Sequence, residues 1–202
     1  MFEKFDNKLD GIKVALLSTD GFEYDELTKP KLALEKAGAR VIIVSPETGS
    51  IKGWRNADWA GSVPVDMSLT EAAATDFDAL MLPGGVINPD KLRMNEAAIQ
   101  FVKSFSDSGK PIAAICHGSQ ILIETGVVRG KKMTSWPSLK TDLLNAGAFW
   151  IDEDVVADRN LITSRKPDDI PAFNKKMIEE FAEGSYNTSG IKRKESEMQN
   201  FY

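Results

Sequence analysis

A cysteine and a histidine that stand side by side have the clearest capacity for chemistry in this sequence. Cys116 and His117 are the only residues of their types among 202. They lie in "PIAAICHGSQ", where an apolar run stops and a polar turn begins. A thiolate is a nucleophile, and a nearby imidazole can accept or return a proton. The pair therefore predicts nucleophilic catalysis, with Cys116 as the attacking group.

The place of Cys116 between a strand and a helix supports this prediction. Parallel α/β sheets bind ligands at the carboxyl ends of their strands, and a sharp strand-to-helix turn exposes a nucleophile there. The N-terminus of the following helix favours thiolate, so we expect a thiol pKa below the ordinary value of about 8.5. The backbone N–H of His117 is expected to face a developing oxyanion. Alternatively, the cysteine is a small buried hydrophobe and the histidine only fills the turn.

Two further segments place chemical groups at strand ends. In "LPGG", Gly84 and Gly85 let backbone N–H groups approach a ligand closely. In "GFEYDEL", Glu23 and Glu26 fall at the same edge of the predicted sheet. A carboxyl group beside a thiolate has a raised pKa and can move a proton. Each pattern alone is also typical of an ordinary turn or helix start, so the combination matters.

The elements that must position these residues follow from the apolar pattern. Runs rich in Val, Ile and Leu predict buried strands at 13–19, 40–46, 79–85 and 111–116, separated by amphipathic helices. Such runs are typical of a mostly parallel sheet covered by helices on both faces. The segment from Thr48 to Ser68 predicts a small hairpin insertion, and 154–164 a late hairpin that turns at Arg159 and Asn160.

These elements predict one α/β domain over 13–183. Residues 1–12 are expected to form an N-terminal extension, and residues 184–202 a polar C-terminal tail without helical periodicity. The first eleven residues do not have the pattern of a signal peptide. We therefore expect a cytoplasmic protein.

Composition excludes several classes of partner and cofactor. A net charge of −5 argues against nucleic acid and against an anionic membrane surface. No apolar run approaches the roughly 20 residues that a membrane-spanning helix needs. One cysteine forms no internal disulfide, and one cysteine with one histidine forms no structural zinc site. We expect no metal and no cofactor.

Taken together, the motifs resemble the PfpI (intracellular protease I) family of the DJ-one/PfpI superfamily. The resemblance extends from Lys13 to Phe181 and rests on "GFEYDEL", "DALMLPGG", "GKPIAAICHG", "TSWPSLKTDLLNAG" and "LITSRKPDD". It implies a flavodoxin-like three-layer sandwich, in agreement with the strand and helix pattern.

The resemblance also implies roles for individual residues. Cys116 matches the family nucleophile and His117 its partner, while Glu23 matches the carboxyl group that hydrogen-bonds the sulfur. Asp90 falls near an acidic residue that relatives present to the histidine of a neighbouring subunit, which implies a homodimer or higher oligomer. The oxyanion donors implied are Gly84, Gly85 and the backbone of His117.

The activity implied is cysteine-dependent chemistry on reactive aldehydes. Cys116 would attack a 2-oxoaldehyde or a glycated protein, as in a glutathione-independent glyoxalase or a protein deglycase with a role in the stress response. An intracellular cysteine peptidase uses the same nucleophile and is the alternative. A non-enzymatic redox sensor, in which Cys116 is oxidised, is an alternative of another class. Three tryptophans either line a pocket or pack in the core or an interface: Trp54, Trp59 and Trp136.

Overall fold

The computed structural model of the protein describes the backbone of residues 7–199 and the side chains of residues 7–184. A seven-stranded sheet forms its centre, in the order β11-β12-β8-β7-β1-β3-β6. Neighbouring strands are parallel except β11 and β12, which are antiparallel. The strands are β1 (Lys13–Leu17), β3 (Arg40–Ser45), β6 (Met67–Ser68), β7 (Ala79–Leu82), β8 (Ile112–Ile115), β11 (Val155–Asp158) and β12 (Leu161–Ser164).

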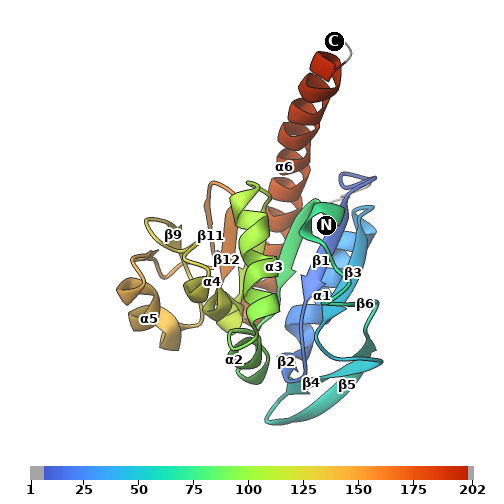
Figure 1. Cartoon of the computed structure of the whole chain (residues 1–202). Helices are drawn as coiled ribbons and strands as arrows, with labels where there is room; N and C mark the ends of the chain where they lie inside the picture. Colours follow the sequence, from blue (N-terminus) through green and yellow to red (C-terminus); the bar gives the residue numbers. More distant parts are fainter. Residues whose placement is uncertain (1–6, 200–202) are drawn as a thin grey trace.

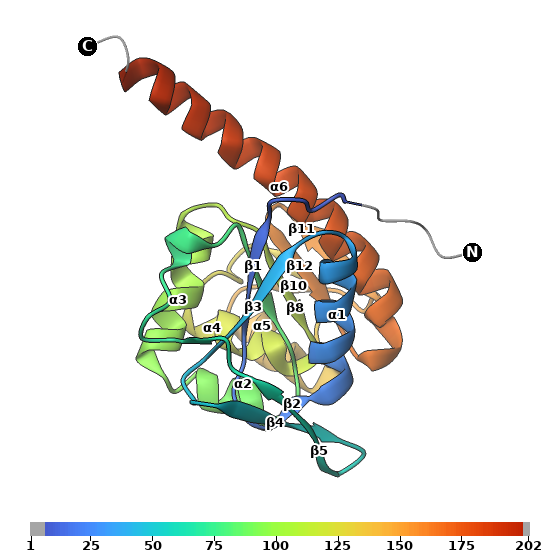
Figure 2. The ribbon, with the colours of Figure 1, turned by 90° about the vertical axis from the view of Figure 1, so that its right-hand side faces the viewer.

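Helices cover both faces of this sheet (Figures 1 and 2). One face carries α1 (Tyr24–Lys36) and α6 (Ile170–Gln199). The other carries α2 (Ile87–Leu92), α3 (Glu96–Asp107) and α4 (Gln120–Glu124). The predicted flavodoxin-like three-layer sandwich is confirmed.

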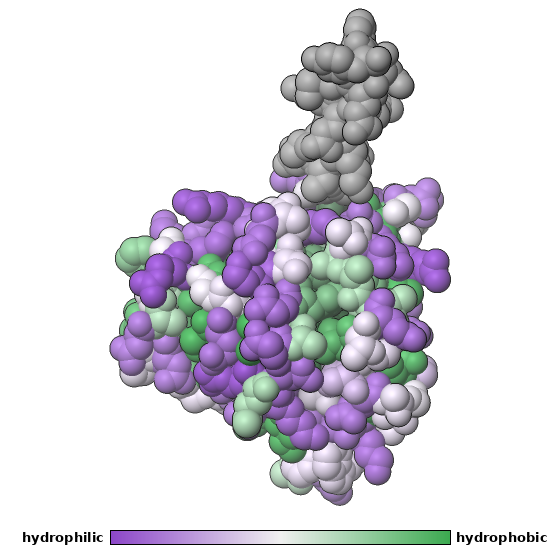
Figure 3. All heavy atoms as spheres, viewed as in Figure 1, coloured by the Kyte–Doolittle hydropathy of each residue, from purple (hydrophilic) through white to green (hydrophobic). Residues whose placement is uncertain are grey.

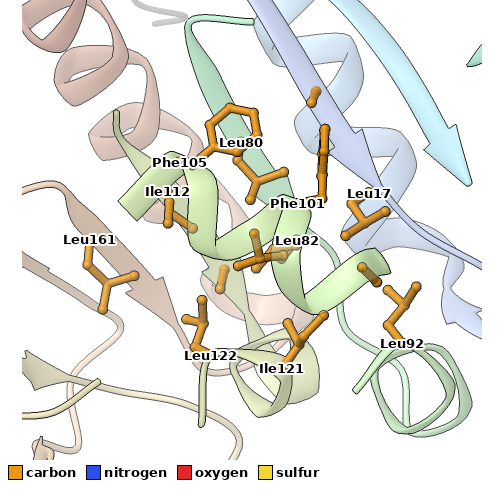
Figure 4. Packing of buried hydrophobic residues seen from close by; sticks show 14 of the residues in the cluster. Leu17, Leu80, Leu82, Leu92, Phe101, Phe105, Ile112, Ile121, Leu122 and Leu161 are labelled. Atoms are coloured by element: carbon orange, nitrogen blue, oxygen red, sulfur yellow. The ribbon is translucent and has the colours of Figure 1, made fainter. Parts of the chain in front are cut away.

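Successive side chains of a strand point to opposite faces of the sheet, and both faces are covered, which explains why the strand sequences lack polar residues. In β1, Ala15 and Leu17 enter the cluster that faces α3 and α4, whereas Val14 and Leu16 enter the cluster that faces α1 and α6. All four are buried because both faces of the sheet are covered. Figure 4 shows the first cluster, where Phe105 of α3 and Ile121 and Leu122 of α4 surround the sheet residues.

Two smaller sheets flank the main one. The predicted hairpin insertion is confirmed as β4 (Ser50–Arg55) and β5 (Asp58–Pro64), with β2 (Phe22–Glu23) parallel to β4. The second small sheet pairs β9 (Lys132–Met133) with β10 (Phe149–Trp150), on either side of α5 (Lys140–Asn145). The late hairpin is also confirmed, since β11 and β12 pair across Arg159, whose φ is 58°.

The hairpin between β4 and β5 has an unusual turn. Arg55 pairs with Asp58, so Asn56 and Ala57 form the loop, and their φ angles are 53° and 63°. Two left-handed residues define a type I′ turn, whose second position glycine usually fills. The alanine at that position therefore stores backbone strain.

Both ends of the domain differ from the prediction. Leu9 is fully buried, and its backbone N–H donates to the Ala37 carbonyl at 2.8 Å, so this part of the expected extension packs against the domain. Helix α6 continues to Gln199 (Figure 1). The expectation of a tail without helical periodicity is therefore wrong for residues 184–199. Residues 1–6 and 200–202 lie outside the described part of the chain.

The surface agrees with a charged composition. In the view of Figure 3 hydrophilic side chains predominate, and apolar ones gather in hollows between them. Within residues 7–199, no helix has the length and apolar character that crossing a membrane requires.

Candidate active site

The candidate site lies where four adjacent strands of the sheet end. Strands β12, β8, β7 and β1 are consecutive neighbours, and all four are parallel. Their carboxyl ends therefore meet at one edge, which is where sheets of this kind bind ligands. The segments that follow these strands supply most of the residues around one pocket of about 490 Å³. Its lining consists of Glu23, Glu26, Trp54, Arg55, Asn56, Ala57, Gly85, Val86, Cys116, His117, Trp136 and Pro167.

Cys116 occupies a strained turn directly after β8. Its φ is +60°, in the left-handed region that residues other than glycine rarely adopt. Strain of this kind costs on the order of 1–3 kcal/mol and is concentrated at functional sites. The side chain is 6% exposed and lines the pocket, so the sulfur is shielded yet open to a small molecule. This geometry is that of a nucleophile elbow.

His117 lies between the sulfur and a hydroxyl group. Its Nδ1 is 3.3 Å from Cys116 Sγ, and its Nε2 is 3.3 Å from Ser138 Oγ. The ring stacks on Trp136 with centroids 6.0 Å apart. Burial lowers the pKa of His117 from its usual value, so the imidazole is neutral at pH 7 and able to accept a proton.

The carboxyl group beside the sulfur belongs to Glu26, which corrects the expectation for Glu23. Burial, and then the charge of Glu23, raise the pKa of Glu26 to about 8. Smaller opposing effects come from the Cys116 thiol and the N–H groups of Gly84 and Gly85. Neither carboxyl oxygen has a partner at ordinary hydrogen-bond geometry among the described residues. Glu26 is therefore a protonated acid at neutral pH.

Glu23 instead caps helix α1. Its carboxylate accepts the backbone N–H of Glu26 at 2.7 Å, the usual role of an N-cap residue. Burial raises the pKa of Glu23, and the hydrogen bond from Glu26 lowers it by less. The geometry of the helix start explains why Glu26, rather than Glu23, lies beside the sulfur. Glu23 is the cap, and Glu26, three positions later, begins the face of α1 that turns inward.

The surroundings of Cys116 do not give the lowered thiol pKa that the turn predicts. The N–H groups of His117 and Gly85 lower it, as expected of such a turn. Burial raises the pKa more strongly, and the carboxylate form of Glu26 raises it further. The thiol therefore needs a base to remove its proton, and His117 Nδ1 is in reach.

The glycine pair after β7 leaves no room for side chains. A Cβ at Gly84 would collide with Glu26 Oε2 and lie 2.7 Å from Cys116 Cβ. Gly85 has a φ of +84°, and a Cβ there would collide with the Gly21 carbonyl oxygen. Backbone therefore approaches the sulfur and the carboxyl group from this side.

A buried asparagine that sequence reasoning missed holds this loop. Asn88 Oδ1 accepts the backbone N–H of Thr19 at 2.8 Å. Its Nδ2 donates to the carbonyls of Pro83 at 3.0 Å and Gly84 at 3.2 Å. One side chain thus links the ends of β1 and β7, and its only signal in the sequence is a polar residue soon after "LPGG". Ser138 was missed likewise, because a lone serine in a turn has no distinctive pattern.

Hairpin β4–β5 forms the opposite wall. Trp54, Arg55, Asn56 and Ala57 line the pocket from the hairpin. Of the three tryptophans in question, Trp54 and Trp136 line the pocket, whereas Trp59 packs edge-on against Trp54 with centroids 5.2 Å apart. The hairpin therefore contributes one aromatic ring, that of Trp54, and three residues of its turn to this side of the pocket.

Asp90 is not brought to the pocket within one chain. It lies in the first turn of α2, is exposed and does not line the cavity. Its expected contact with a neighbouring subunit stays a prediction. Among residues 7–184, no group of three or more His, Cys, Asp or Glu side chains is arranged to hold a metal ion.

Comparison with known proteins now identifies the family. The model of the DJ-1/PfpI family matches residues 12–180. The chain belongs to the DJ-1/PfpI family. Within it, the similar proteins include deglycase PfpI of Pyrococcus furiosus, 41% identical over 167 residues, which are 83% of this chain and 98% of that protein. The chain is thus a member of the PfpI family in this superfamily.

Other relatives have related names. Protein/nucleic acid deglycase 2 of Escherichia coli is 44% identical over 168 residues, which are 82% of this chain and 95% of that protein. YraA of Bacillus subtilis, which has a provisional name as a cysteine protease, is 42% identical over 82% of this chain and 96% of its own length. Among solved structures, Drosophila melanogaster DJ-1beta matches with a TM-score of 0.77 and 30% identity over 89% of this chain and 97% of its own.

Proposed function

We propose that this protein converts reactive 2-oxoaldehydes, free or attached to protein amino groups, by attack of Cys116 on the aldehyde carbon. The observation that carries the proposal is the contact of Cys116 Sγ with His117 Nδ1 at 3.3 Å, in a pocket that also contains the Glu26 acid. A thiol, a neutral base and a protonated carboxyl group are the set that this chemistry requires. The deglycase names of the relatives from Escherichia coli and Pyrococcus furiosus support it.

The first step forms a carbon–sulfur bond. Sulfur attacks the aldehyde carbon as its proton passes to His117 Nδ1, and the carbonyl π electrons move to oxygen. In this proposal the backbone N–H groups of Gly85 and His117 hold the oxyanion, and their lowering effect on the thiol pKa supports that role. Protonation of that oxygen by Glu26 gives a hemithioacetal and leaves a Glu26 carboxylate.

The carboxylate then moves a proton between the two substrate carbons. It takes the proton of the former aldehyde carbon, while the His117 imidazolium protonates the neighbouring carbonyl oxygen, which gives an enediol. Glu26 then gives a proton to the adjacent carbon and accepts the proton of the first hydroxyl group as that oxygen becomes the carbonyl of the thioester. Water cleaves the thioester to a 2-hydroxy acid and restores the thiol. With a hemiaminal as substrate, the C–N bond breaks first: Glu26 protonates the leaving amine, and the hydroxyl group gives its proton back to Glu26 as the aldehyde carbonyl re-forms. The same sequence then acts on this aldehyde, and the net result is deglycation.

The pocket favours small substrates over extended peptides. Trp54 on the hairpin and Trp136 beside His117 bound a space of about 490 Å³, which suits a small molecule or one modified side chain. Peptide hydrolysis, the activity suggested by the provisional name of YraA, stays the alternative. Because a catalytic thiol must stay reduced, we further propose that the protein acts in the cytoplasm.

The decisive experiment uses methylglyoxal with a lactate assay and intact-protein mass spectrometry. Wild type is expected to form lactate, and Cys116→Ala to lose at least about 10³-fold of the activity while its melting curve stays unchanged. Cys116 is the sole cysteine, so any thiol adduct is assigned without mapping. Lactate formation by Cys116→Ala, or casein cleavage without lactate formation by wild type, would contradict the proposal.

We also propose self-association through the face that carries Asp90. Exposed Val86 caps α2 and lines the pocket, and exposed Ile87 and Asp90 follow in the first turn of this helix, so a second copy seated there would bring Asp90 close to a partner site. Mixing Cys116→Ala with Asp90→Ala under subunit exchange should restore about a quarter of wild-type activity, by symmetry alone. An Asp90→Ala variant with full activity would rule out this role.

A further inference from the structure

Two adjacent glycines carry the peptide group that faces the sulfur. A Cβ at Gly84 would lie 2.7 Å from Cys116 Cβ, and the N–H of Gly85 lowers the pKa of both the Cys116 thiol and the Glu26 carboxyl group. We propose that Asn88 is a positioning residue that holds the Gly84 carbonyl away from the sulfur, so that the Gly85 N–H points at the oxyanion formed there. The catalytic consequence rests on the proposed function, whereas the orientation of the peptide does not.

A peptide group between two glycines needs a restraint from elsewhere. The torsion angles on its two sides belong to residues without a Cβ, so the group can turn over at little steric cost. In this trans peptide the carbonyl of Gly84 and the N–H of Gly85 point in opposite directions. A turned peptide would therefore present the Gly84 oxygen to the sulfur, where it would repel a thiolate or a developing oxyanion.

Asn88 supplies this restraint. Its Nδ2 donates to the Gly84 carbonyl at 3.2 Å, and the backbone N–H of Glu23 donates to the same oxygen, also at 3.2 Å. Both lone pairs of the Gly84 oxygen are then occupied. The second bond from Nδ2, to the Pro83 carbonyl at 3.0 Å, fixes the preceding peptide group as well. One side-chain amide thus holds two consecutive carbonyls of the loop.

The Asn88 side chain is itself firmly held. It is fully buried, and its Oδ1 accepts the backbone N–H of Thr19 at 2.8 Å and the hydroxyl group of Ser18 at 3.3 Å. Because a backbone N–H only donates and a carbonyl only accepts, these partners decide which end of the amide is oxygen. All four hydrogen-bonding positions of the amide are used. The end of β1 therefore sets, through Asn88, the orientation of the loop that follows β7.

Alkylation of the thiol tests the orientation without any substrate. Cys116 is the sole cysteine, so the uptake of iodoacetamide in intact-protein mass spectra reports on this residue alone. In Asn88→Ala the Gly85 N–H is no longer aimed at the sulfur, so the thiol holds its proton more tightly. We expect alkylation at pH 8 to be slower by about threefold, which corresponds to a rise of about half a unit in the thiol pKa.

Two control variants separate this role from a loss of stability. Ser18→Ala removes one bond to Oδ1 of Asn88 and leaves both bonds from Nδ2. Asn160→Ala is the matched substitution at the amino ends of β8 and β12, where Asn160 donates to the Lys110 carbonyl and accepts from Lys131 Nζ, each at 3.1 Å. All three variants lose hydrogen bonds and should unfold at lower urea concentrations. Only Asn88→Ala should change the alkylation rate.

Kinetics provide the second readout. Asn88→Ala should lower kcat for methylglyoxal about tenfold and leave KM nearly unchanged, because the Gly85 N–H serves the transition state rather than substrate binding. Asn160→Ala should change neither constant. If Asn88→Ala does not fold, Asn88→Ser is used, since it retains a polar group at this position. It should still slow both alkylation and turnover relative to Asn160→Ala.

Two results would overturn the inference. One is a folded Asn88 variant that is alkylated at the wild-type rate, whatever its turnover. The other is a rise in KM at unchanged kcat, because Asn88 would then shape the pocket rather than orient the peptide group. Slower alkylation of Asn88→Ala together with a wild type that forms no lactate would support the positioning role and contradict the proposed function.

Discussion

The two walls of the pocket differ in how they are built. The strand-end wall consists of Cys116, Gly85 and Glu26, which are enclosed by the sheet and α1 and include two residues at positive φ. The hairpin wall consists of Trp54 to Ala57, which are mostly exposed and connected to the core by a two-stranded ribbon. The two groups of this wall that carry a proton, the Cys116 thiol and the Glu26 carboxyl group, are therefore held at a fixed distance from each other. The exposed wall can change without disturbing them, so it is suited to substrate selection.

The largest effect is expected where the buried wall has no space. Gly85→Ala puts a Cβ against the Gly21 carbonyl and only 2.6 Å from the Glu23 nitrogen, in a backbone conformation that alanine avoids. We expect a loss of at least about 4 kcal/mol in the free energy of unfolding, measured by urea denaturation. Gly109→Ala is the control, because Gly109 also has a positive φ but has nothing within 4 Å. It should cost about 1 kcal/mol. Equal costs would show that the wall is not rigid.

Next in size is the distinction between the two glutamates. Glu26→Gln should lower aldehyde turnover about 10²-fold, since it removes the proton that Glu26 holds. Glu23→Gln should lower turnover far less and weaken the cap of α1 by about 1 kcal/mol. Steady-state kinetics and urea denaturation of both variants provide the comparison. The reverse ranking of the two turnovers would return the role at sulfur to Glu23.

Glu26 also predicts a pH dependence of the free energy of unfolding. The pKa of Glu26 is about 8 in the folded chain, against its ordinary 4.5, so the folded state retains a proton that the unfolded state releases in between. Wild type should therefore lose stability relative to Glu26→Gln as pH rises from 4.5 to 8, with an upper limit of about 5 kcal/mol. Below pH 4.5 the difference should be constant. Urea titrations at pH 4, 6 and 8.5 measure this difference in the free energy of unfolding between the two proteins. A difference that stays the same at all three pH values would mean that Glu26 is ionised when folded.

A smaller effect is expected on the hairpin wall. Trp54→Ala removes an aromatic surface from the pocket without touching Cys116 or His117, so we expect KM for methylglyoxal to change about tenfold and kcat to stay within threefold. Phe149→Ala, an exposed aromatic residue on β10, controls for loss of a ring elsewhere. A large fall in kcat with unchanged KM would place Trp54 among the groups that act on the transition state.

The smallest effect concerns the hairpin turn. Ala57→Gly relieves a φ of 63° in a type I′ turn, and we expect stabilisation of about 0.5–1 kcal/mol by urea denaturation. The gain is small because glycine also adds freedom to the unfolded chain. Destabilisation would show that the Ala57 side chain contributes packing at the pocket rim.

The sequence by itself determined the layers and the position of Cys116 at a strand end. Runs such as "KVALLST" and "PIAAIC" predict doubly covered parallel strands because period and composition are local properties. The location of Cys116 at the end of one run then places it at the ligand-binding edge, whichever way the other elements pack. The hairpin from Thr48 to Ser68 was predictable for the same reason, from its glycines and tryptophans.

Only the tertiary structure decided which groups face the sulfur. Glu23 and Glu26 are three residues apart at one helix start, and sequence cannot tell the cap from the first inward-facing residue. Burial, which raises the thiol pKa against the effect of the turn, depends on the packing of α1 and the glycine loop around Cys116. Ser138 reaches His117 from 21 positions away. Such contacts between distant segments leave no periodic trace in the sequence, because each is set by how separate elements pack.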